Sequence, residues 1–109
     1  MELAEISLKD ALALATMFAQ KQTDTAFQLG KAYLIRTVTF YYTGRLKQIT
    51  SKEFVLEEAA WIADTGRFSE CLKEGVFNEI EPYKNDVIIP RDSIIDGTLW
   101  DHKLPRNVK

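Results

Sequence analysis

Strand-like segments recur along the chain from Lys31 onward, separated by polar or glycine-containing stretches. Each segment is rich in Val, Ile, Thr, Tyr or Phe, which fit a pleated, half-buried surface. They follow one another at intervals of roughly ten residues, a spacing typical of a small antiparallel barrel or sandwich. Closing the sheet into a barrel removes its exposed edges, so we expect a barrel. The expected strands are residues 31–42, 45–50, 53–63, 76–81, 87–90 and 94–100.

Two other stretches have the pattern of helices. Ser7-Leu8-Lys9-Asp10 has the pattern of a capping box, and apolar residues then recur at three- and four-residue spacing. This predicts a helix over residues 7–22, whose apolar stripe packs either on its own domain or on a neighbouring subunit. A shorter helix is expected over Phe68–Glu74, ending at Gly75. The expected turns are Thr43-Gly44, as a turn or a bulge, and Asp64-Thr65-Gly66-Arg67.

The length of 109 residues is close to the commonest size of a single domain. Hydrophobic residues make up 46% and charged residues 28% of the chain, as in ordinary globular proteins, and no repeat or linker is evident. We therefore expect one domain over residues 1–109, of the α+β class and mostly β. Its predicted parts are the N-terminal helix over 7–22, a small, strongly bent antiparallel β-barrel over 31–100 and a C-terminal tail over 101–109.

The charge balance bears on the class of partner. Fourteen basic and 16 acidic residues give a net charge of −2. Binding to a phosphate backbone needs clustered Lys and Arg, and the chain as a whole has no basic excess, although a local basic patch stays open. Residues 1–7 are acidic where a secretion signal is basic, and no apolar run approaches the roughly 18 residues that cross a bilayer. We therefore expect a cytoplasmic protein without a membrane partner.

The residues that commonly catalyse reactions or bind metals form no recognisable constellation. His102 and Cys71 are the single histidine and cysteine, whereas a transition-metal site usually takes three or four nitrogen or sulfur ligands. One cysteine cannot form an intramolecular disulfide, and the acidic neighbours Glu70 and Glu74 are expected to raise its thiol pKa. Nucleophile elbows and glycine-rich phosphate loops are absent from the sequence. We expect a non-enzymatic protein with no cofactor and no metal.

Aromatic rings and guanidinium groups are better candidates, and they point to binding. Bases stack on aromatic rings, and arginine binds phosphate through two parallel hydrogen bonds. Arg67 and Arg91 both lie at predicted turns, and loops on a rigid scaffold are where ligands usually bind. We expect these two arginines to contact phosphate, and Trp61 or Phe68 to stack on a base. The structural alternatives are arginines that cap turns or bridge subunits, and rings that lie in the core.

Two stretches resemble the motifs of the Sm family of small β-barrels, which includes the Lsm and Hfq types. Residues 43–50 followed by 53–59 are similar to the first Sm motif, in which a Gly-x-Leu strand bends and the next strand reads much like Leu-Val-Leu-Glu-Asp-Ala. Residues 87–95 are similar to the second motif, in which an apolar strand, an Arg-Gly-Asp-like turn and a final apolar strand follow one another. Here Pro90-Arg91 replaces the Arg-Gly pair, and Glu53 stands near the base-contacting Asn of the family.

The resemblance implies a strongly bent Sm-like barrel, preceded by a helix, that assembles into a homo-oligomeric ring by pairing edge strands between neighbours. RNA rich in uridine or adenine would bind the loops around the pore, here residues 50–54 and 90–93, which adds Asp92 to the candidate ligand-binding residues. The segment over residues 61–68 also resembles small uncharacterised proteins encoded by bacteriophages and prophages. That second resemblance suggests an origin and no chemistry.

Two functions from different classes follow from these expectations. The first is a non-enzymatic nucleic-acid- or nucleotide-binding protein. It would assemble into a ring of identical subunits and bind RNA or a small nucleotide. The second is a structural or protein–protein interaction component, such as a phage assembly factor or an inhibitor of host defence, with no nucleotide ligand. The loop arginines and the rings beside them favour the first.

Overall fold

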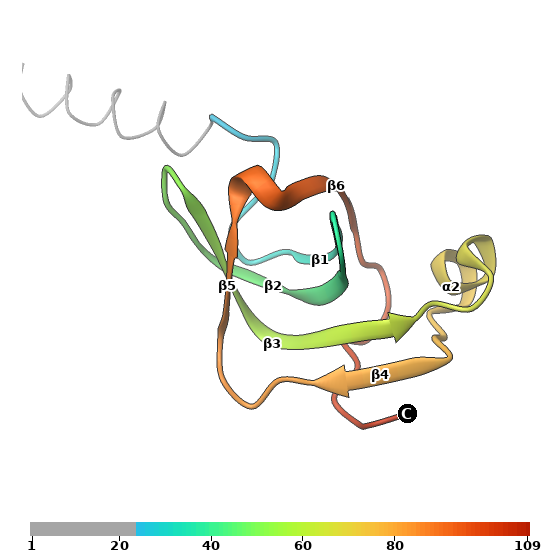
Figure 1. Cartoon of the computed structure of the whole chain (residues 1–109). Helices are drawn as coiled ribbons and strands as arrows, with labels where there is room; N and C mark the ends of the chain where they lie inside the picture. Colours follow the sequence, from blue (N-terminus) through green and yellow to red (C-terminus); the bar gives the residue numbers. More distant parts are fainter. Residues whose placement is uncertain (1–23) are drawn as a thin grey trace, which may run out of the picture.

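The computed structural model describes residues 24–109, and within them the chain forms a six-stranded antiparallel sheet with one α-helix and one 3-10 helix (Figure 1). The helix predicted over residues 7–22 lies outside these residues. The α-helix that is described, α2, follows the third strand. The elements are β1 Ala32–Thr37, β2 Tyr41–Ile49, β3 Glu53–Asp64, α2 Phe68–Glu74, β4 Glu79–Pro82, β5 Val87–Pro90, η1 Arg91–Ser93 and β6 Ile94–Leu99.

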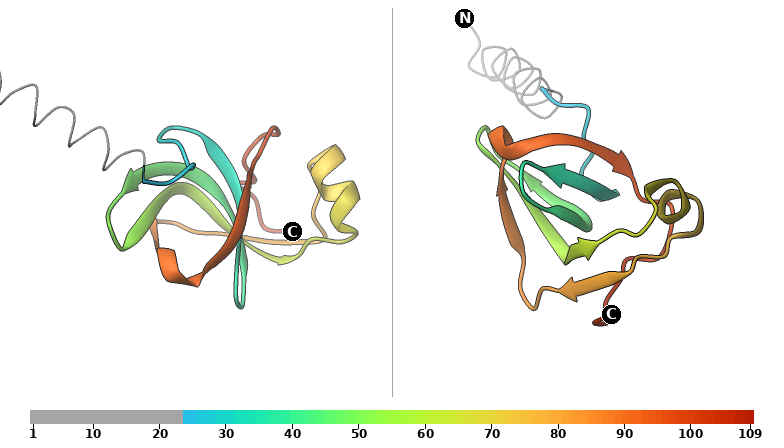
Figure 2. Two further views of the ribbon diagram at one scale, coloured as in Figure 1. Left: turned by 90° about the horizontal axis from the view of Figure 1, so that it is seen from above. Right: turned by 45° about the vertical axis from the view of Figure 1, so that its right-hand side comes forward.

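The long strand β3 organises the sheet, whose order is β4-β3-β2-β1-β6 with β5 also paired to β3. The first part of β3, residues 53–56, pairs with β5, and its last part, residues 60–64, pairs with β4. Between the two parts lies Glu58, whose φ of 50° is the only positive value of a non-glycine residue in the described chain. This left-handed residue lets β3 change direction, so the sheet curls strongly (Figure 2).

The predicted closed barrel is wrong, because the sheet stays open. β5 and β6 follow one another through η1, yet β5 pairs with β3 and β6 with β1, and no pairing between β5 and β6 occurs in residues 24–109. Pro90 ends β5 and has no N–H to donate, and η1 then redirects the chain so that the two strands cross at a wide angle (Figure 1). The prediction that the sheet closes into a barrel and leaves no exposed strand edge is therefore wrong.

One edge is protected in another way. Lys109 exchanges two backbone hydrogen bonds of 3.0 Å with Ile80, so the end of the chain lies along the outer edge of β4. The outer edges of β5 and β6 have no strand partner within the described residues.

The sheet carries a hydrophobic core on each face, because successive β1 residues point to opposite sides and are buried on both. Leu34 belongs to the core that lies beneath α2 and the C-terminal residues, which we call the outer core. Tyr33 and Ile35 belong to the core enclosed by the curled sheet, the inner core. The outer core comprises Leu34, Ala60, Ile62, Cys71, Phe77, Ile80, Trp100 and Leu104, and the inner core Tyr33, Ile35, Leu46, Phe54, Leu56, Ala59 and Ile89.

The segment over 101–109, predicted as a tail, packs against the sheet. Leu104 is buried in the outer core, and the indole Nε1 of Trp100 donates to the carbonyl of Lys103 at 3.2 Å. Arg106 donates to the carbonyls of Ala59, at 2.8 Å, and Tyr83, at 3.0 Å. The C-terminal residues therefore cover the outer core.

The first hairpin turns earlier than predicted. The strand expected over 31–42 is broken after Thr37, whose backbone N–H donates to the Phe40 carbonyl at 2.7 Å and whose hydroxyl oxygen accepts from the Phe40 N–H at 3.0 Å. Thr43-Gly44 lies inside β2, where the pairing with β3 shifts register, so it is a bulge and no turn. A Cβ at Gly44 would lie 3.0 Å from the Cβ of Leu56, which explains the glycine there.

The short helix over Phe68–Glu74 is confirmed, with its end at Gly75 in the left-handed conformation. No helix among residues 24–109 combines the length and the hydropathy of a bilayer-spanning segment.

Candidate functional site

Four aromatic side chains, Phe40, Tyr42, Trp61 and Tyr83, gather at one end of the curled sheet and are called the aromatic patch. The ring of Phe40 stands edge-on to Trp61, with centroids 5.4 Å apart, and to Tyr42 at 6.2 Å. Tyr42 and Tyr83 are stacked with centroids 6.1 Å apart. The four rings therefore form one contiguous cluster in favourable aromatic geometries.

Backbone register fixes the position of each ring in the patch. Tyr42 of β2 pairs directly with Trp61 of β3, so their side chains share a face. Phe40 is held by the turn that Thr37 closes. Tyr83 follows β4 and donates its N–H to the carbonyl of Ala59 at 2.8 Å, while its own carbonyl accepts from Arg106.

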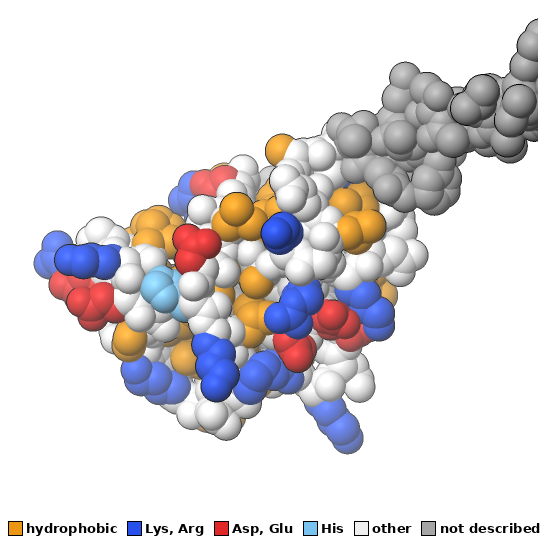
Figure 3. Space-filling model, turned by 180° about the vertical axis from the view of Figure 1, so that it is seen from behind, with side chains coloured by type: hydrophobic (Ala, Val, Ile, Leu, Met, Phe, Trp, Pro, Cys, Tyr) orange, Lys and Arg blue, Asp and Glu red, His pale blue; other side chains and the backbone are white. Residues whose placement is uncertain are grey.

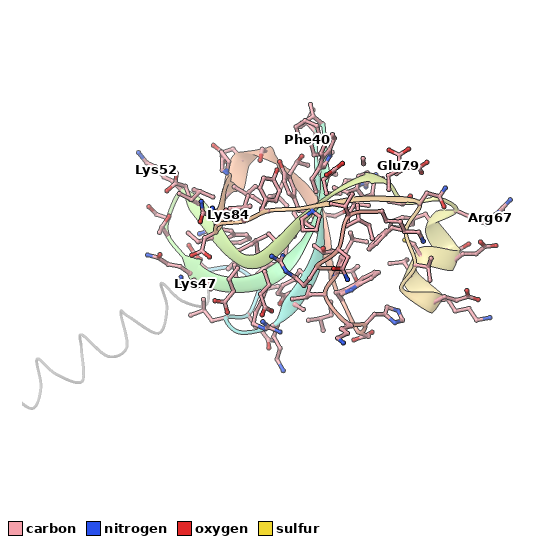
Figure 4. The ribbon with its side chains drawn as sticks, turned by 90° about the horizontal axis from the view of Figure 1, so that it is seen from below. Phe40, Lys47, Lys52, Arg67, Glu79 and Lys84 are labelled. Atoms are coloured by element: carbon pink, nitrogen blue, oxygen red, sulfur yellow. The ribbon has the colours of Figure 1, made fainter. Side chains whose placement is uncertain are left out.

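The patch is open to solvent at its rim. Phe40 is 43% and Tyr83 37% exposed, whereas Tyr42 and Trp61 are half-buried beneath them. Phe40 lies at the tip of the first hairpin and points away from the body of the sheet, on a different side of the molecule from Arg67 (Figure 4). Rings held in this way offer a large contact area and lose little conformational entropy on binding.

The charges near the patch are of both signs, with an exposed Lys84 directly after Tyr83 and an acidic residue next to Trp61. Glu81 of β4 pairs with Trp61 and is exposed, so its carboxylate lies on the same face as the indole. Arg45 forms an ion pair with Glu58. Burial, with Tyr83 as a smaller cause, raises the pKa of Tyr42, so its phenol stays neutral near pH 7 and can donate a hydrogen bond.

Arg67 and Phe68, two of the predicted site residues, lie together at the start of α2. The Arg67 side chain is 76% exposed, and its Nε lies 3.9 Å from the carboxylate of Glu70. Phe68 is 46% exposed, and its ring meets Tyr41 edge-on at 6.2 Å. These two residues therefore cover the outer core, away from the aromatic patch that contains Trp61.

Arg91 and Asp92 lie in η1, on the other side of the sheet from α2 (Figures 1 and 2). The Arg91 guanidinium donates to the carbonyl of Thr50 at 2.8 Å and to the carboxylate of Asp24 at 3.3 and 3.4 Å. It also lies over the ring of Phe54, 5.1 Å from the centroid. With only 20% of its side chain exposed, Arg91 is committed to contacts within the chain.

The five predicted site residues thus occupy three separate places, and only Trp61 lies in the aromatic patch. Sequence reasoning missed Phe40, Tyr42 and Tyr83 as site residues. The usable signal was the run Phe40-Tyr41-Tyr42, which begins three residues after Thr37, a residue type that closes turns with its hydroxyl. Tyr83 had no local signal, because it reaches the patch through strand pairing.

Metal and nucleophile chemistry find no support in the described residues. No group of three or more His, Cys, Asp or Glu side chains among residues 24–109 is placed to hold a metal ion. Cys71 is fully buried in the outer core, and burial, in place of the expected acidic neighbours, raises the pKa of its thiol. The His102 ring donates from Nε2 to the Leu72 carbonyl at 2.8 Å and fastens the C-terminal segment to α2.

The surface around His102 is of mixed character. Lys and Arg side chains are spread over this face with acidic and apolar side chains between them (Figure 3). The local basic patch that composition left open is not evident there. No protein-family model, curated protein or solved structure matches the chain. The resemblances to Sm proteins and to phage-encoded proteins stay predictions.

Proposed function

We propose that this chain is a non-enzymatic interaction module that binds an extended segment of a protein partner at the aromatic patch. The observation that carries the proposal is the open rim of the patch, where Phe40 and Tyr83 expose 43% and 37% of their surface. Extended peptides, and proline-rich ones above all, dock into aromatic-lined surfaces because their conformation is already ordered before binding.

Charge favours a peptide over a nucleic acid at this place. The Glu81 carboxylate beside Trp61 repels phosphate and attracts a cation. Arg91, one of the two arginines predicted to contact phosphate, is occupied by Asp24 and Thr50, and Arg67 lies on α2. A segment with proline or other apolar side chains next to Arg or Lys complements both the rings and the carboxylate.

The second candidate function is stacking of single-stranded RNA or a nucleotide on the same rings. The observation in its favour is the exposed Lys84, which directly follows Tyr83 and could meet a phosphate. This candidate keeps the ligand class that the sequence favoured and moves it from the loop arginines to the aromatic patch.

The test compares two labelled probes, a proline-rich peptide carrying arginines and a uridine-rich oligonucleotide, by fluorescence anisotropy. We expect the peptide to bind wild type, and Phe40→Ala to weaken binding by about ten-fold or more, as loss of an aromatic anchor usually does. Phe68→Ala is the matched control, because Phe68 is similarly exposed but lies on α2.

Selective oligonucleotide binding that Phe40→Ala removes would establish the second candidate instead. Binding of either probe that responds equally to Phe40→Ala and Phe68→Ala would exclude the patch as the site. Assembly into a homo-oligomer and a cytoplasmic location remain part of the proposal. Within residues 24–109 the outer edges of β5 and β6 have no strand partner, and copies could pair there.

A further inference from the structure

A socket for an aromatic ring lies at the opposite end of the inner core, and a residue of the chain itself fills it. The ring of Phe27 enters a socket formed by Tyr33, Phe54 and Gly97. Its centroid lies 4.8 Å from that of Tyr33 and 4.9 Å from that of Phe54. A Cβ on Gly97 would lie 2.6 Å from the Phe27 ring, so the socket admits this ring because residue 97 is glycine.

A cationic group stands at the rim of the socket and meets the residue three positions before Phe27. Arg91 is fixed by the Thr50 carbonyl at 2.8 Å and by the Phe54 ring beneath it. Its remaining donors point at the carboxylate of Asp24, at the longer distances of 3.3 and 3.4 Å. The socket and Arg91 thus hold a carboxylate and an aromatic ring of the chain itself, spaced as Asp-x-x-Phe.

The surface beside the occupant is hollowed on two sides. An open hollow of about 270 Å³ borders Phe27 on the side of Tyr33 and Leu99. Another of about 260 Å³ borders it on the side of Arg91 and Ile95. A bound segment with larger side chains around its aromatic ring would bury more surface in the same place.

The attachment of the occupant is also loose. Residues 24–27 make no backbone hydrogen bond to a strand in the described chain, and their anchors are the Phe27 ring and the Asp24 carboxylate. Backbone fastening begins only at Gln28, which donates to the Tyr33 hydroxyl at 2.8 Å, and at Gly30, which donates to the Leu46 carbonyl at 2.7 Å. Release of residues 24–27 would therefore break no backbone hydrogen bond of the sheet.

We propose that this socket binds a partner protein's segment of the form Asp-x-x-Phe, and that residues 24–27 cover it until such a segment competes. The covering segment acts at the high effective concentration of a tethered ligand, in the millimolar range for short connections. A free segment therefore binds wild type weakly and binds tightly once the covering ring is removed. The site is separate from the aromatic patch, which lies at the other end of the curled sheet.

The experiment uses the full chain and a fluorescein-labelled peptide that keeps Asp and Phe at this spacing in a Gly-Ser background. We expect the Phe27→Ala variant to bind it at least about ten-fold more tightly than wild type, because the tethered competitor is gone. Peptides lacking the Asp or the Phe serve as ligand controls, and Phe68→Ala serves as the control for removing an exposed ring elsewhere. Adding Gly97→Leu to Phe27→Ala fills the socket and abolishes the gain.

Equal affinity of wild type and Phe27→Ala, or equal binding of the peptide lacking Phe, overturns the proposal. If Phe27→Ala does not unfold cooperatively, Asp24→Ala replaces it, since that change removes only the competing carboxylate, and an increase over wild type that the peptide lacking Asp does not show is required. Hydrogen exchange of residues 24–30 in wild type must rise when excess peptide is added. A stable wild-type dimer that Gly97→Leu dissociates would show that a second copy is the occupant, which contradicts a separate partner.

Discussion

The guanidinium of Arg106 donates to the carbonyl of Ala59, the residue directly after the left-handed Glu58 at the bend of β3. A second N–H of the same group reaches the carbonyl of Tyr83, a member of the aromatic patch. The Arg106 side chain therefore connects the bend of β3 to Tyr83, which follows β4 and belongs to the aromatic patch. The shape of the sheet and the geometry of the patch depend on the same contact.

Replacing Arg106 by alanine should lower the free energy of unfolding by about 1.5–3 kcal/mol, since it removes hydrogen bonds from a charged donor to two backbone carbonyls. Urea unfolding followed by tryptophan fluorescence measures the change. Arg67→Ala is the matched control and should stay within about 0.5 kcal/mol of wild type, because Arg67 is exposed and weakly paired. Equal effects of the two substitutions would contradict the proposed role of Arg106.

Thr43→Val should leave stability unchanged or raise it by about 1 kcal/mol. The Thr43 hydroxyl is buried in the outer core, between Leu34 and Ala60, and has no hydrogen-bond partner in the described residues, whereas valine has the same shape. Thr37→Val is the matched control at another buried threonine, and it should cost about 1–2 kcal/mol because it removes the hydroxyl that closes the turn before Phe40. Thermal unfolding of both variants decides the order, and a Thr43→Val loss as large as that of Thr37→Val would refute the prediction.

Gly75→Ala should destabilise the protein more than Gly30→Ala. Both glycines have positive φ, 72° and 82°, so both substitutions incur the left-handed cost of about 1–2 kcal/mol. Only at Gly75 would the new Cβ also collide with a neighbour, since it would lie 2.4 Å from Cγ of His102. The difference between the two variants in chemical denaturation therefore measures how firmly His102 holds α2, and no difference would mean that the His102 contact is dispensable.

Stability should fall at alkaline pH in a way that depends on Tyr42. Burial raises its pKa above the ordinary value of about 10 in the folded state, so the folded protein binds the phenolic proton more tightly than the unfolded chain does. The resulting stabilisation is complete below about pH 10 and is lost as the pH rises through the folded pKa. Cys71 contributes with the same sign from a lower starting value. Urea midpoints between about pH 8 and about pH 11 should decline less steeply in Tyr42→Phe than in wild type.

Local patterns predicted the elements that local interactions determine. The sequence predicted β3 from its β-branched and apolar residues, and it predicted the end of α2 from Gly75. Both lie close to the predicted positions. Closure of the barrel failed because it depends on whether two distant strands can pair, and Pro90 with η1 prevents that for β5 and β6. The burial of Leu104 was missed for a similar reason, since its polar neighbours in sequence give no sign of the core that it meets in space.

The candidate site, too, was predictable only in part from local sequence. Trp61 was identified as a binding residue from its type, but its companions Phe40 and Tyr83 reach it through a turn and a strand pairing. Arg91 had the expected position after Pro90, and its commitment to Asp24 depended on a segment 67 residues away in sequence. Residue type therefore predicted candidate binding residues. Which residues they contact could be learned only from the fold.

Because β3 belongs to both cores and pairs with β2, β4 and β5, neither half of the molecule can lose its structure alone. Melting the inner core removes the support of Phe54 and Leu56, and melting the outer core removes that of Ala60 and Ile62 on the same strand. The described chain should consequently behave as a single cooperative unit, with the slowest-exchanging amides in the middle of the sheet. A partner that stiffens either end of this strand would also steady the other end.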